Sequence, residues 1–244
     1  MSEPGSRRAG TLFLVPTLLG AAQVERSLPP AVQARVYALH AFVAENAKSA
    51  RQFLKAIAFP RTLAQTPIEE LNEHTPQARI PDLLQPLRDG LDLGLLSEAG
   101  CPAVADPGAA LVALAHLEGL HVVPLVGPSS LLLALMASGL NGQRFCFHGY
   151  LPVDRTAREN SIRSLERVSR TERAAQIVIE TPYRNNRLIA SLTQVCQPDT
   201  LLCVAADLTL ETEYIRTQPI EKWRRQPPDL DKRPAVFVLQ ATTA

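Results

Sequence analysis

Residues Leu91–Ser130 read LDLGLLSEAGCPAVADPGAALVALAHLEGLHVVPLVGPSS, and this stretch decides the fold of the chain. Two apolar segments, Leu91–Leu96 and His121–Leu125, have the composition of buried strands, and each runs into a loop rich in glycine and proline. The helix predicted between them, Ala109–Glu118, ends at Gly119. Because neighbouring parallel strands need a crossover connection, this alternation predicts a parallel sheet with helices on both faces.

The loops after these strands lie where ligands bind in sheets of this kind. Carboxyl ends of parallel strands share one edge of the sheet, where loops offer backbone N–H and C=O groups over a rigid floor. Ser97–Gly108 follows the first strand and Val126–Ser130 follows the second. A third apolar strand, Thr11–Val15, is stopped by Pro16 and followed by the loop Thr17–Gly20. The pattern predicts a small-molecule site, although glycine and proline also serve simple chain reversal.

The alternation continues through the chain and predicts two α/β domains. Further helices are predicted over about Ala47–Ala58 and Ile80–Arg88, and we expect the nearly all-apolar helix Ser129–Ser138 to be buried on most sides. The turn signal Asn141–Gly142 predicts a domain boundary, giving domains 1–142 and 143–244. In the second domain the predicted strands are 145–150, 174–180, 201–206, 213–216 and 235–240, and the predicted helices are 155–170 and 186–195.

Composition and charge exclude several classes of protein. The 244 residues are 46% hydrophobic and 20% charged, as in ordinary globular proteins. The net charge of +1 gives no global attraction to nucleic acid or anionic lipid, so an RNA contact would require a local basic patch. We find no apolar core of a signal peptide and no run long enough to span a membrane, and we expect a cytoplasmic protein. The four scattered cysteines predict reduced thiols and no metal site.

Motifs of several common enzyme classes are absent from the sequence. There is no Gly-x-Gly-x-x-Gly after a strand, no P-loop, no Gly-x-Ser-x-Gly elbow and no His-Glu-x-x-His. Dinucleotide-dependent redox chemistry, P-loop hydrolysis and zinc-protease chemistry are therefore disfavoured.

A set of short motifs in a fixed order nevertheless resembles a known family. The motifs are Thr11–Thr17, Leu96–Gly108, Val126–Ser130, Gly139–Leu140, Phe147–Pro152 and Glu180–Arg184. Together they cover nearly the whole chain and are similar to the tetrapyrrole methylase superfamily of S-adenosylmethionine-dependent methyltransferases. Within it the sequence most resembles the branch of ribosomal RNA small subunit methyltransferase I, which methylates a cytidine ribose 2′-hydroxyl.

This resemblance implies a homodimer in which each chain has two α/β domains and binds a folded S-adenosylmethionine in the cleft between them. The superfamily binds its cofactor without the glycine fingerprint that is absent here. In the first domain the implied cofactor-binding residues are Pro16, Thr17, Leu18, Ser97, Glu98, Ala99, Gly100, Asp106, Gly127, Pro128, Ser129 and Ser130. In the second domain they are Thr181, Pro182, Ala206 and Leu208.

The chemistry of methyl transfer suggests what else the site needs. Transfer from a sulfonium is an in-line displacement, so alignment of donor and acceptor lowers the barrier without a special side chain. A ribose hydroxyl must also lose its proton, which calls for a general base. Glu45, Glu98 and His74 are the candidates, and the sequence does not choose among them. Glu45 and Glu98 can equally be solvated loop carboxylates or helix caps.

The chain departs from the branch at residues that we expect to face the substrate. The first loop has Leu18 and Ala21 where the branch has a second proline and an asparagine, and Glu45–Lys48 (ENAK) replaces Glu-Asp-Thr-Arg. Basic residues that could bind an RNA phosphate are Lys48, Arg51, Arg184 and Arg187. Three functions stay open: a methyltransferase of ribosomal RNA, a methyltransferase of a small tetrapyrrole-like acceptor, and a protein that binds S-adenosylmethionine without transferring its methyl group.

Overall fold

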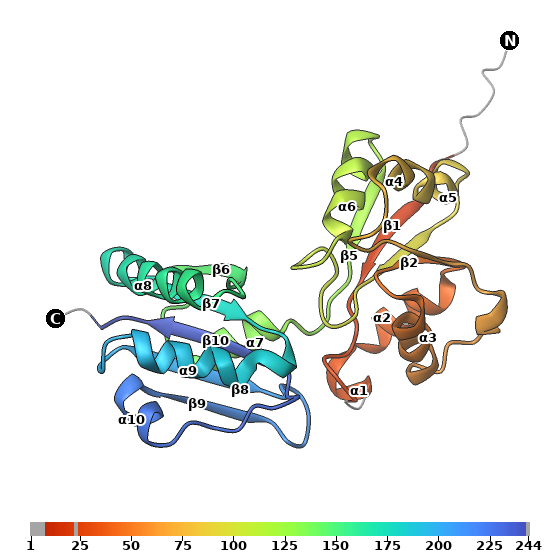
Figure 1. Ribbon diagram of the computed structural model, residues 1–244. Coiled ribbons are helices and arrows are strands. Elements are labelled where there is room, and N and C mark those ends of the chain that lie inside the picture. Colours follow the sequence, from red (N-terminus) through yellow and green to blue (C-terminus); the bar gives the residue numbers. More distant parts are fainter. Residues whose placement is uncertain (1–7, 22–23, 243–244) are drawn as a thin grey trace, which may run out of the picture. The chain divides into compact units, whose positions relative to one another are not determined.

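The chain forms two compact units, residues 1–129 and 130–244 (Figure 1). The structure is a computed structural model that describes residues 8–21 and 24–242. Each unit is built on a five-stranded sheet, which confirms the predicted α/β class. The predicted boundary at Asn141–Gly142 lies beyond this division, because α7 (Ser130–Ser138) packs on the sheet of the second unit.

The first sheet is parallel throughout, as the alternation of strands and helices predicts. Its strands are β1 (Thr11–Val15), β2 (Ala41–Ala44), β3 (Ile68–Glu70), β4 (Leu93–Leu96) and β5 (His121–Pro124). Their order in the sheet is β3-β2-β4-β1-β5. The carboxyl ends of β1, β4 and β5, which are neighbours in this order, therefore hold the three predicted ligand loops side by side.

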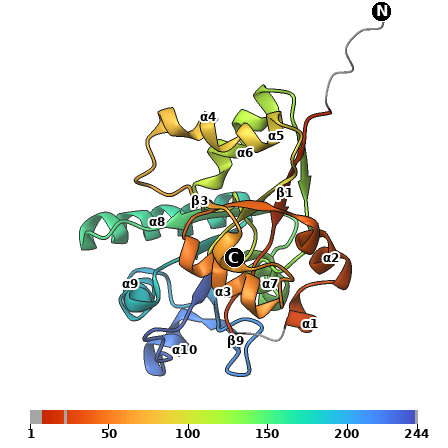
Figure 2. The ribbon, with the colours of Figure 1, turned by 90° about the vertical axis from the view of Figure 1, so that its right-hand side faces the viewer.

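Helices cover both faces of this sheet, because successive side chains of a strand point to opposite faces. Phe13 and Val15 pack in one core with α1 (Val24–Ser27), α2 (Pro30–Ala38) and α3 (Ala47–Ala56). Leu12 packs in the other core with α4 (Ile80–Leu83), α5 (Gln85–Arg88) and α6 (Gly108–Leu117). Figure 2 shows these two layers on opposite sides of β1. The single helix predicted over Ile80–Arg88 is two short helices, each with a proline in its first turn.

The second sheet mixes parallel and antiparallel pairs. Its strands are β6 (Phe145–Tyr150), β7 (Ala175–Ile179), β8 (Leu201–Ala206), β9 (Tyr214–Pro219) and β10 (Ala235–Gln240). The order is β6-β7-β10-β8-β9. β6 and β7 are parallel, whereas β10 is antiparallel to both β7 and β8. β7 and β8 therefore run in the same direction on either side of β10, and their carboxyl ends share one edge.

Helices again form a layer on each face of the second sheet (Figures 1 and 2). One layer consists of α8 (Arg155–Glu172), α9 (Asn185–Val195) and α10 (Ile220–Arg225). The other is α7, which contacts β8, β9 and β10. Burial of α7 on most sides was expected, but only one of its faces packs on the sheet, and Met136 is 78% exposed. Among the described helices, none has both the length and the apolar character needed to cross a bilayer.

The core of the second unit offers a direct test of this architecture. Phe237 and Trp223, the single tryptophan of the chain, are fully buried in the same cluster. We expect Phe237→Ala to lower the free energy of unfolding by about 3–5 kcal/mol, because it leaves a cavity as well as losing buried apolar surface. Urea unfolding followed by Trp223 fluorescence measures this loss. Tyr183→Ala removes an exposed aromatic side chain of the same unit and should cost about 0.5 kcal/mol or less. Equal losses in both variants would contradict the packing described here.

Candidate functional site

The loops after β1, β4 and β5 are joined to one another by hydrogen bonds. The backbone N–H of Thr17 donates to the Gly100 carbonyl oxygen at 2.9 Å, and Thr17 Oγ1 donates to the Ser97 carbonyl oxygen at 3.3 Å. The third loop joins through Cys101, whose Sγ donates to the carbonyl oxygen of Pro128 at 3.4 Å. The structure thus brings together the loops that the sequence predicted as the first-domain side of a cofactor site.

Two glycines allow these loops to approach so closely. A Cβ atom at Gly127 would lie 2.2 Å from Cγ of Pro16, a distance that no side chain tolerates. Gly100 has a φ of +76°, which disfavours any residue with a Cβ, and its missing Cβ would meet Leu19 Cδ2 at 3.2 Å. Both glycines are therefore required by the packing of the loops.

Several polar side chains of the predicted cofactor site hold the loops in place. Thr17 and Ser97 are buried, and the Ser97 hydroxyl donates to the Gly100 carbonyl oxygen at 2.9 Å. Asp106 Oδ1 accepts hydrogen bonds from the N–H groups of Ala103 at 3.0 Å and of Gly108, at the start of α6, at 2.6 Å. Burial raises the pKa of Asp106, and these two donors oppose the shift.

The remaining first-domain residues of the predicted cofactor site differ in how far they are open to a ligand. Glu98 and Ala99 are exposed and Ser129 is half-buried, so these groups can face a bound molecule. Leu18 packs against the core beneath β1, and Ser130 begins α7 in the second unit.

A groove of about 560 Å³ lies at the carboxyl ends of β2, β3 and β4. Its lining residues are Glu45, Asn46, Asn72, Glu73, His74, Glu98, Ala105, Asp106 and Pro107. All three candidate general bases are among them. Glu45 follows β2, His74 lies in the segment after β3, and Glu98 lies in the loop after β4. They are distant in sequence and meet here because neighbouring parallel strands end at the same edge.

Glu45 is the candidate base whose surroundings most alter its proton affinity. Burial raises the pKa of this half-buried carboxyl, and the nearby negative charges of Glu98, Asp106 and Glu73 raise it further. A carboxylate with a raised pKa is the stronger base. Glu98, in contrast, is exposed and accepts a hydrogen bond from the Ser49 hydroxyl at 3.2 Å.

His74 lies at the open rim of the groove. Its side chain is exposed, and Nε2 lies 3.6 Å from a carboxylate oxygen of Glu73, which is exposed as well. Across the part of the chain that the structure describes, no three histidine, cysteine, aspartate or glutamate side chains are grouped so as to hold a metal ion.

The second-unit residues of the predicted site lie at the ends of β7 and β8. Thr181 and Pro182 come just after β7, and Ala206 ends β8. Asp207 follows with a φ of +52°, and its Oδ2 accepts hydrogen bonds from Arg233 Nε at 2.7 Å and from the Thr212 hydroxyl at 3.0 Å.

The predicted phosphate-binding residues fall into two pairs. Lys48 and Arg51 are exposed on α3, which begins after the groove residue Asn46. Arg187 is exposed on α9, but Arg184 is engaged in an ion pair, with Nη2 2.6 Å from Glu180 Oε1. The structure therefore gives Arg184 a structural role, whereas a role in substrate binding stays a prediction.

Sequence reasoning missed two parts of this arrangement. Asn46 and Asn72 line the groove. The position of Asn72 after β3 could have placed it there, but β3 has only 3 residues and gives a weak signal in the sequence. The ion pair of Arg233 with Asp207 had no local signal, because the two residues are distant in sequence and meet through the antiparallel pairing of β8 with β10.

Comparisons with known proteins agree with the predicted resemblance. No family model matches the sequence. The ribosomal RNA small subunit methyltransferase I of Pseudomonas aeruginosa is 32% identical over 212 residues, which cover 87% of this chain and 71% of that protein. The protein of the same name from Escherichia coli O157:H7 is 28% identical over 240 residues, covering 96% and 79%. The Xylella fastidiosa protein of that name is 32% identical over 209 residues, covering 86% and 70%.

Two solved structures share the fold. The methyltransferase CobJ matches with a TM-score of 0.65 at 19% identity, covering 96% of this chain and 95% of that one. The uroporphyrin-III-C-methyltransferase from Thermus thermophilus matches with a TM-score of 0.55 at 19% identity, covering 95% and 92%. The predicted fold of two α/β domains is confirmed, and so is the predicted similarity to ribosomal RNA small subunit methyltransferase I.

The carboxylates that line the groove should influence the titration of Glu45. We expect Glu98→Gln to lower the pKa of Glu45, because the Glu98 carboxylate is the strongest neighbouring charge acting against its ionisation. That pKa should stay above its ordinary value, since burial is the larger cause. Carbon-13 NMR titration of the side-chain carboxyls measures the pKa of Glu45 in the unaltered chain and in the variant. The matched control is Glu69→Gln, at an exposed position on β3. An unchanged Glu45 titration in Glu98→Gln would contradict the coupling.

The raised pKa of Glu45 also makes the stability of the fold depend on pH. Because the folded state keeps the Glu45 proton to higher pH than the unfolded state, the free energy of unfolding should fall as pH rises from the unfolded pKa to the folded pKa. That fall should be smaller in Glu98→Gln than in the unaltered chain.

Proposed function

Because the chain belongs to the ribosomal RNA small subunit methyltransferase I family, and is therefore a methyltransferase, we propose that it transfers the methyl group of S-adenosylmethionine to a ribose 2′-hydroxyl of ribosomal RNA. One observation carries the proposal. Residues 97–108 belong to the predicted cofactor loops and also supply Glu98 and Asp106 to the groove that holds Glu45. One segment of chain thus contributes both to the predicted cofactor loops and to the groove of the candidate general base.

The residues of the joined loops fit S-adenosylmethionine in their chemistry. Gly100 and Gly127 let the loops pack closely on one another, so that the backbone groups of this edge are held in fixed positions for a ligand. Glu98 adds an exposed negative charge to this edge, which favours a sulfonium and an ammonium group. Bound there, S-adenosylmethionine supplies the electrophilic methyl group.

We assign the general base to Glu45. With S-adenosylmethionine bound as the methyl donor, the Glu45 carboxylate would take the proton of the acceptor hydroxyl as that oxygen receives the methyl group. Its raised pKa suits this role, because a base whose pKa lies nearer the working pH takes the proton more readily. The rigid joined loops keep donor and acceptor aligned, which lowers the barrier further.

Two alternative functions, the homodimer and the cytoplasmic location stay predictions. The small tetrapyrrole-like acceptor and the protein that binds without transfer are the alternatives that the two experiments below separate from the proposal. The homodimer and the cytoplasmic location rest on the family resemblance and the sequence.

Cofactor binding is the first test. Isothermal titration of the full chain with S-adenosylmethionine should show binding, and Gly127→Ala should weaken it by at least tenfold, about 1.4 kcal/mol, because the new Cβ pushes the loop away from Pro16. Gly142→Ala is the matched control, since a Cβ there meets no atom. A folded chain that binds no S-adenosylmethionine would overturn the proposed function.

Methyl transfer tests the role of Glu45. With unmodified small-subunit ribosomal RNA and labelled S-adenosylmethionine, Glu45→Gln should lower kcat by about 10²- to 10⁴-fold and leave cofactor affinity unchanged, because only the proton acceptor is lost. Glu69→Gln removes an exposed carboxylate from the same unit and should keep the original rate. Transfer by Glu45→Gln at the original rate would show that another group is the base. Cofactor binding without transfer to any RNA would favour one of the alternatives.

A further inference from the structure

The groove that holds Glu45 does not suit the phosphate backbone of RNA. Glu45, Glu73, Glu98 and Asp106 all line it, and of the lining residues that the structure describes only the exposed His74 is basic. Carboxylates repel phosphates, whereas affinity for RNA comes largely from lysine and arginine contacts to the backbone. A substrate RNA therefore needs cations on another surface.

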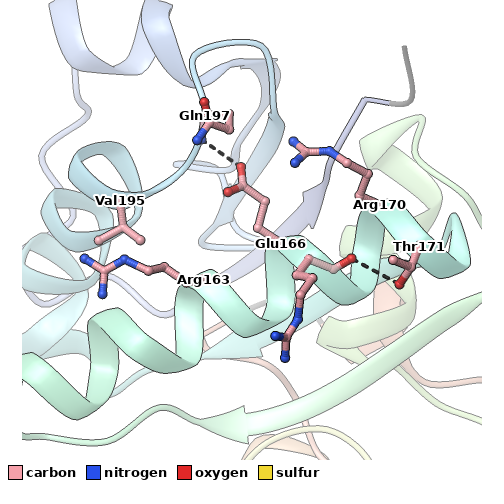
Figure 3. A pocket seen from close by; sticks show the side chains of 7 residues that line it. Arg163, Glu166, Arg170, Thr171, Val195 and Gln197 are labelled. Carbon is pink, nitrogen blue, oxygen red and sulfur yellow. Dashed lines mark hydrogen bonds between the residues drawn. The ribbon is translucent and has the colours of Figure 1, made fainter.

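The second unit carries such a surface on α8. A groove of about 310 Å³ is lined by Arg163, Glu166, Arg167, Arg170, Thr171, Val195 and Gln197 (Figure 3). We call it the α8 arginine groove. Its three arginines occupy positions i, i+4 and i+7 of one helix, so they share a face and extend over about 10 Å at the rise of an α-helix. A row of guanidinium groups of this kind suits successive phosphates of a strand, because each can donate two hydrogen bonds to phosphate oxygens.

Among the described residues that line the α8 arginine groove, Glu166 alone carries a carboxylate, and this side chain is buried and hydrogen-bonded. Glu166 Oε1 accepts a hydrogen bond from the N–H of Gln197 at 2.7 Å and another from the Thr200 hydroxyl. Figure 3 shows Arg163 and Arg170 on either side of the Glu166–Gln197 hydrogen bond. Glu166 therefore fixes α8 to the segment after α9 and forms part of a rigid floor. The groove keeps an excess of positive charge, since three guanidinium groups face one carboxylate.

Two arginines of α8 outside the groove, Arg155 and Arg158, are engaged with the protein. Arg155 pairs with Glu159 at 2.8 Å, and Arg158 donates to the Ser191 hydroxyl at 3.0 Å and to the Val153 carbonyl oxygen at 2.8 Å. Of the groove arginines, Arg163 is also engaged, because it donates to Asn160 Oδ1 at 3.0 Å and lies 3.5 Å from a carboxylate oxygen of Glu159.

Arg167 and Arg170 are the least engaged arginines of the groove. Arg167 makes one long hydrogen bond, to the Ser164 hydroxyl at 3.5 Å. Arg170 acts on Asp199 through its charge, but neither arginine forms an ion pair with any described residue. Their guanidinium groups can thus bind a ligand while giving up few contacts with the protein.

We propose that the α8 arginine groove binds the phosphate backbone of the substrate RNA. The identity of the polyanion rests on the proposed function, whereas the binding surface rests on the geometry of α8. RNA fits better than an anionic membrane, because no described residue of α8 presents a large exposed apolar side chain to enter lipid. The contact is to phosphates, so it is independent of base sequence and fixes where the RNA lies on the second unit.

The test compares two double variants of the full chain. Arg167→Gln with Arg170→Gln removes two charges from the groove, and Lys222→Gln with Arg225→Gln removes two exposed charges from α10 in the same unit. Fluorescence anisotropy with labelled oligouridine gives the Kd over a series of salt concentrations. We expect the groove variant to raise Kd by about tenfold and to reduce the slope of log K against log salt by about 1.4, because two phosphate contacts are lost. The α10 variant should leave the slope nearly unchanged.

Three outcomes would overturn this inference. They are no binding of oligouridine by the unaltered chain, equal effects of the two variants, or tighter binding to phosphatidylserine vesicles that the groove variant abolishes. Titration with S-adenosylmethionine separates this result from the proposed function, since both variants should bind the cofactor as the unaltered chain does. A chain that binds oligouridine through α8 but no cofactor would overturn the proposed function and leave the groove assignment standing.

Discussion

The insertion of β4 between β1 and β2 is the constraint on which the rest of the first unit depends. Parallel pairing on both sides of β4 aligns its carboxyl end with those of β1 and β2. The loop that leaves β4 must then serve both neighbours. On one side it is hydrogen-bonded to the loop after β1, and on the other it supplies Glu98 and Asp106 to the groove with Glu45. A single connection thereby couples the predicted cofactor loops to the proposed base.

Close packing and electrostatics act differently in this region. The close approach of Gly127 to Pro16 and the hydrogen bonds of the Thr17 and Ser97 hydroxyls hold the loops together, so their role is to fix the shape of this edge. Charge is concentrated instead in the neighbouring groove, where burial and then the nearby carboxylates raise the pKa of Glu45. The pKa of a carboxylate base is raised by burial or by nearby negative charges. Nearby negative charges also repel a phosphate backbone. The proposed separation of the proton-transfer surface from the RNA-binding surface resolves this conflict and makes the net charge of +1 compatible with the proposed RNA substrate.

The sequence predicted most strands and helices because their signals are local. Apolar runs such as Thr11–Val15 and Leu201–Ala206 are confirmed as β1 and β8 with the same bounds, and β6 and β10 also match. Errors fall where the signal is short or where packing overrides it. β3 has 3 residues and was missed, the helix predicted over Ile80–Arg88 is divided, and α7 lies on the second sheet rather than in the first domain. A helix that is apolar all round gives no indication of which sheet it will cover.

By itself the sequence determined the fold class, the loops after β1, β4 and β5 and the resemblance to a family, because each of these is written in contiguous residues. It also named Glu45, Glu98 and His74 without ranking them. Only the tertiary structure decided that these three share a groove, that Glu45 is the half-buried one, and that Arg184 is engaged with Glu180 while Arg167 and Arg170 are not. Burial and ion pairing depend on which residues the chain brings together from distant positions, and local sequence patterns do not encode those distances.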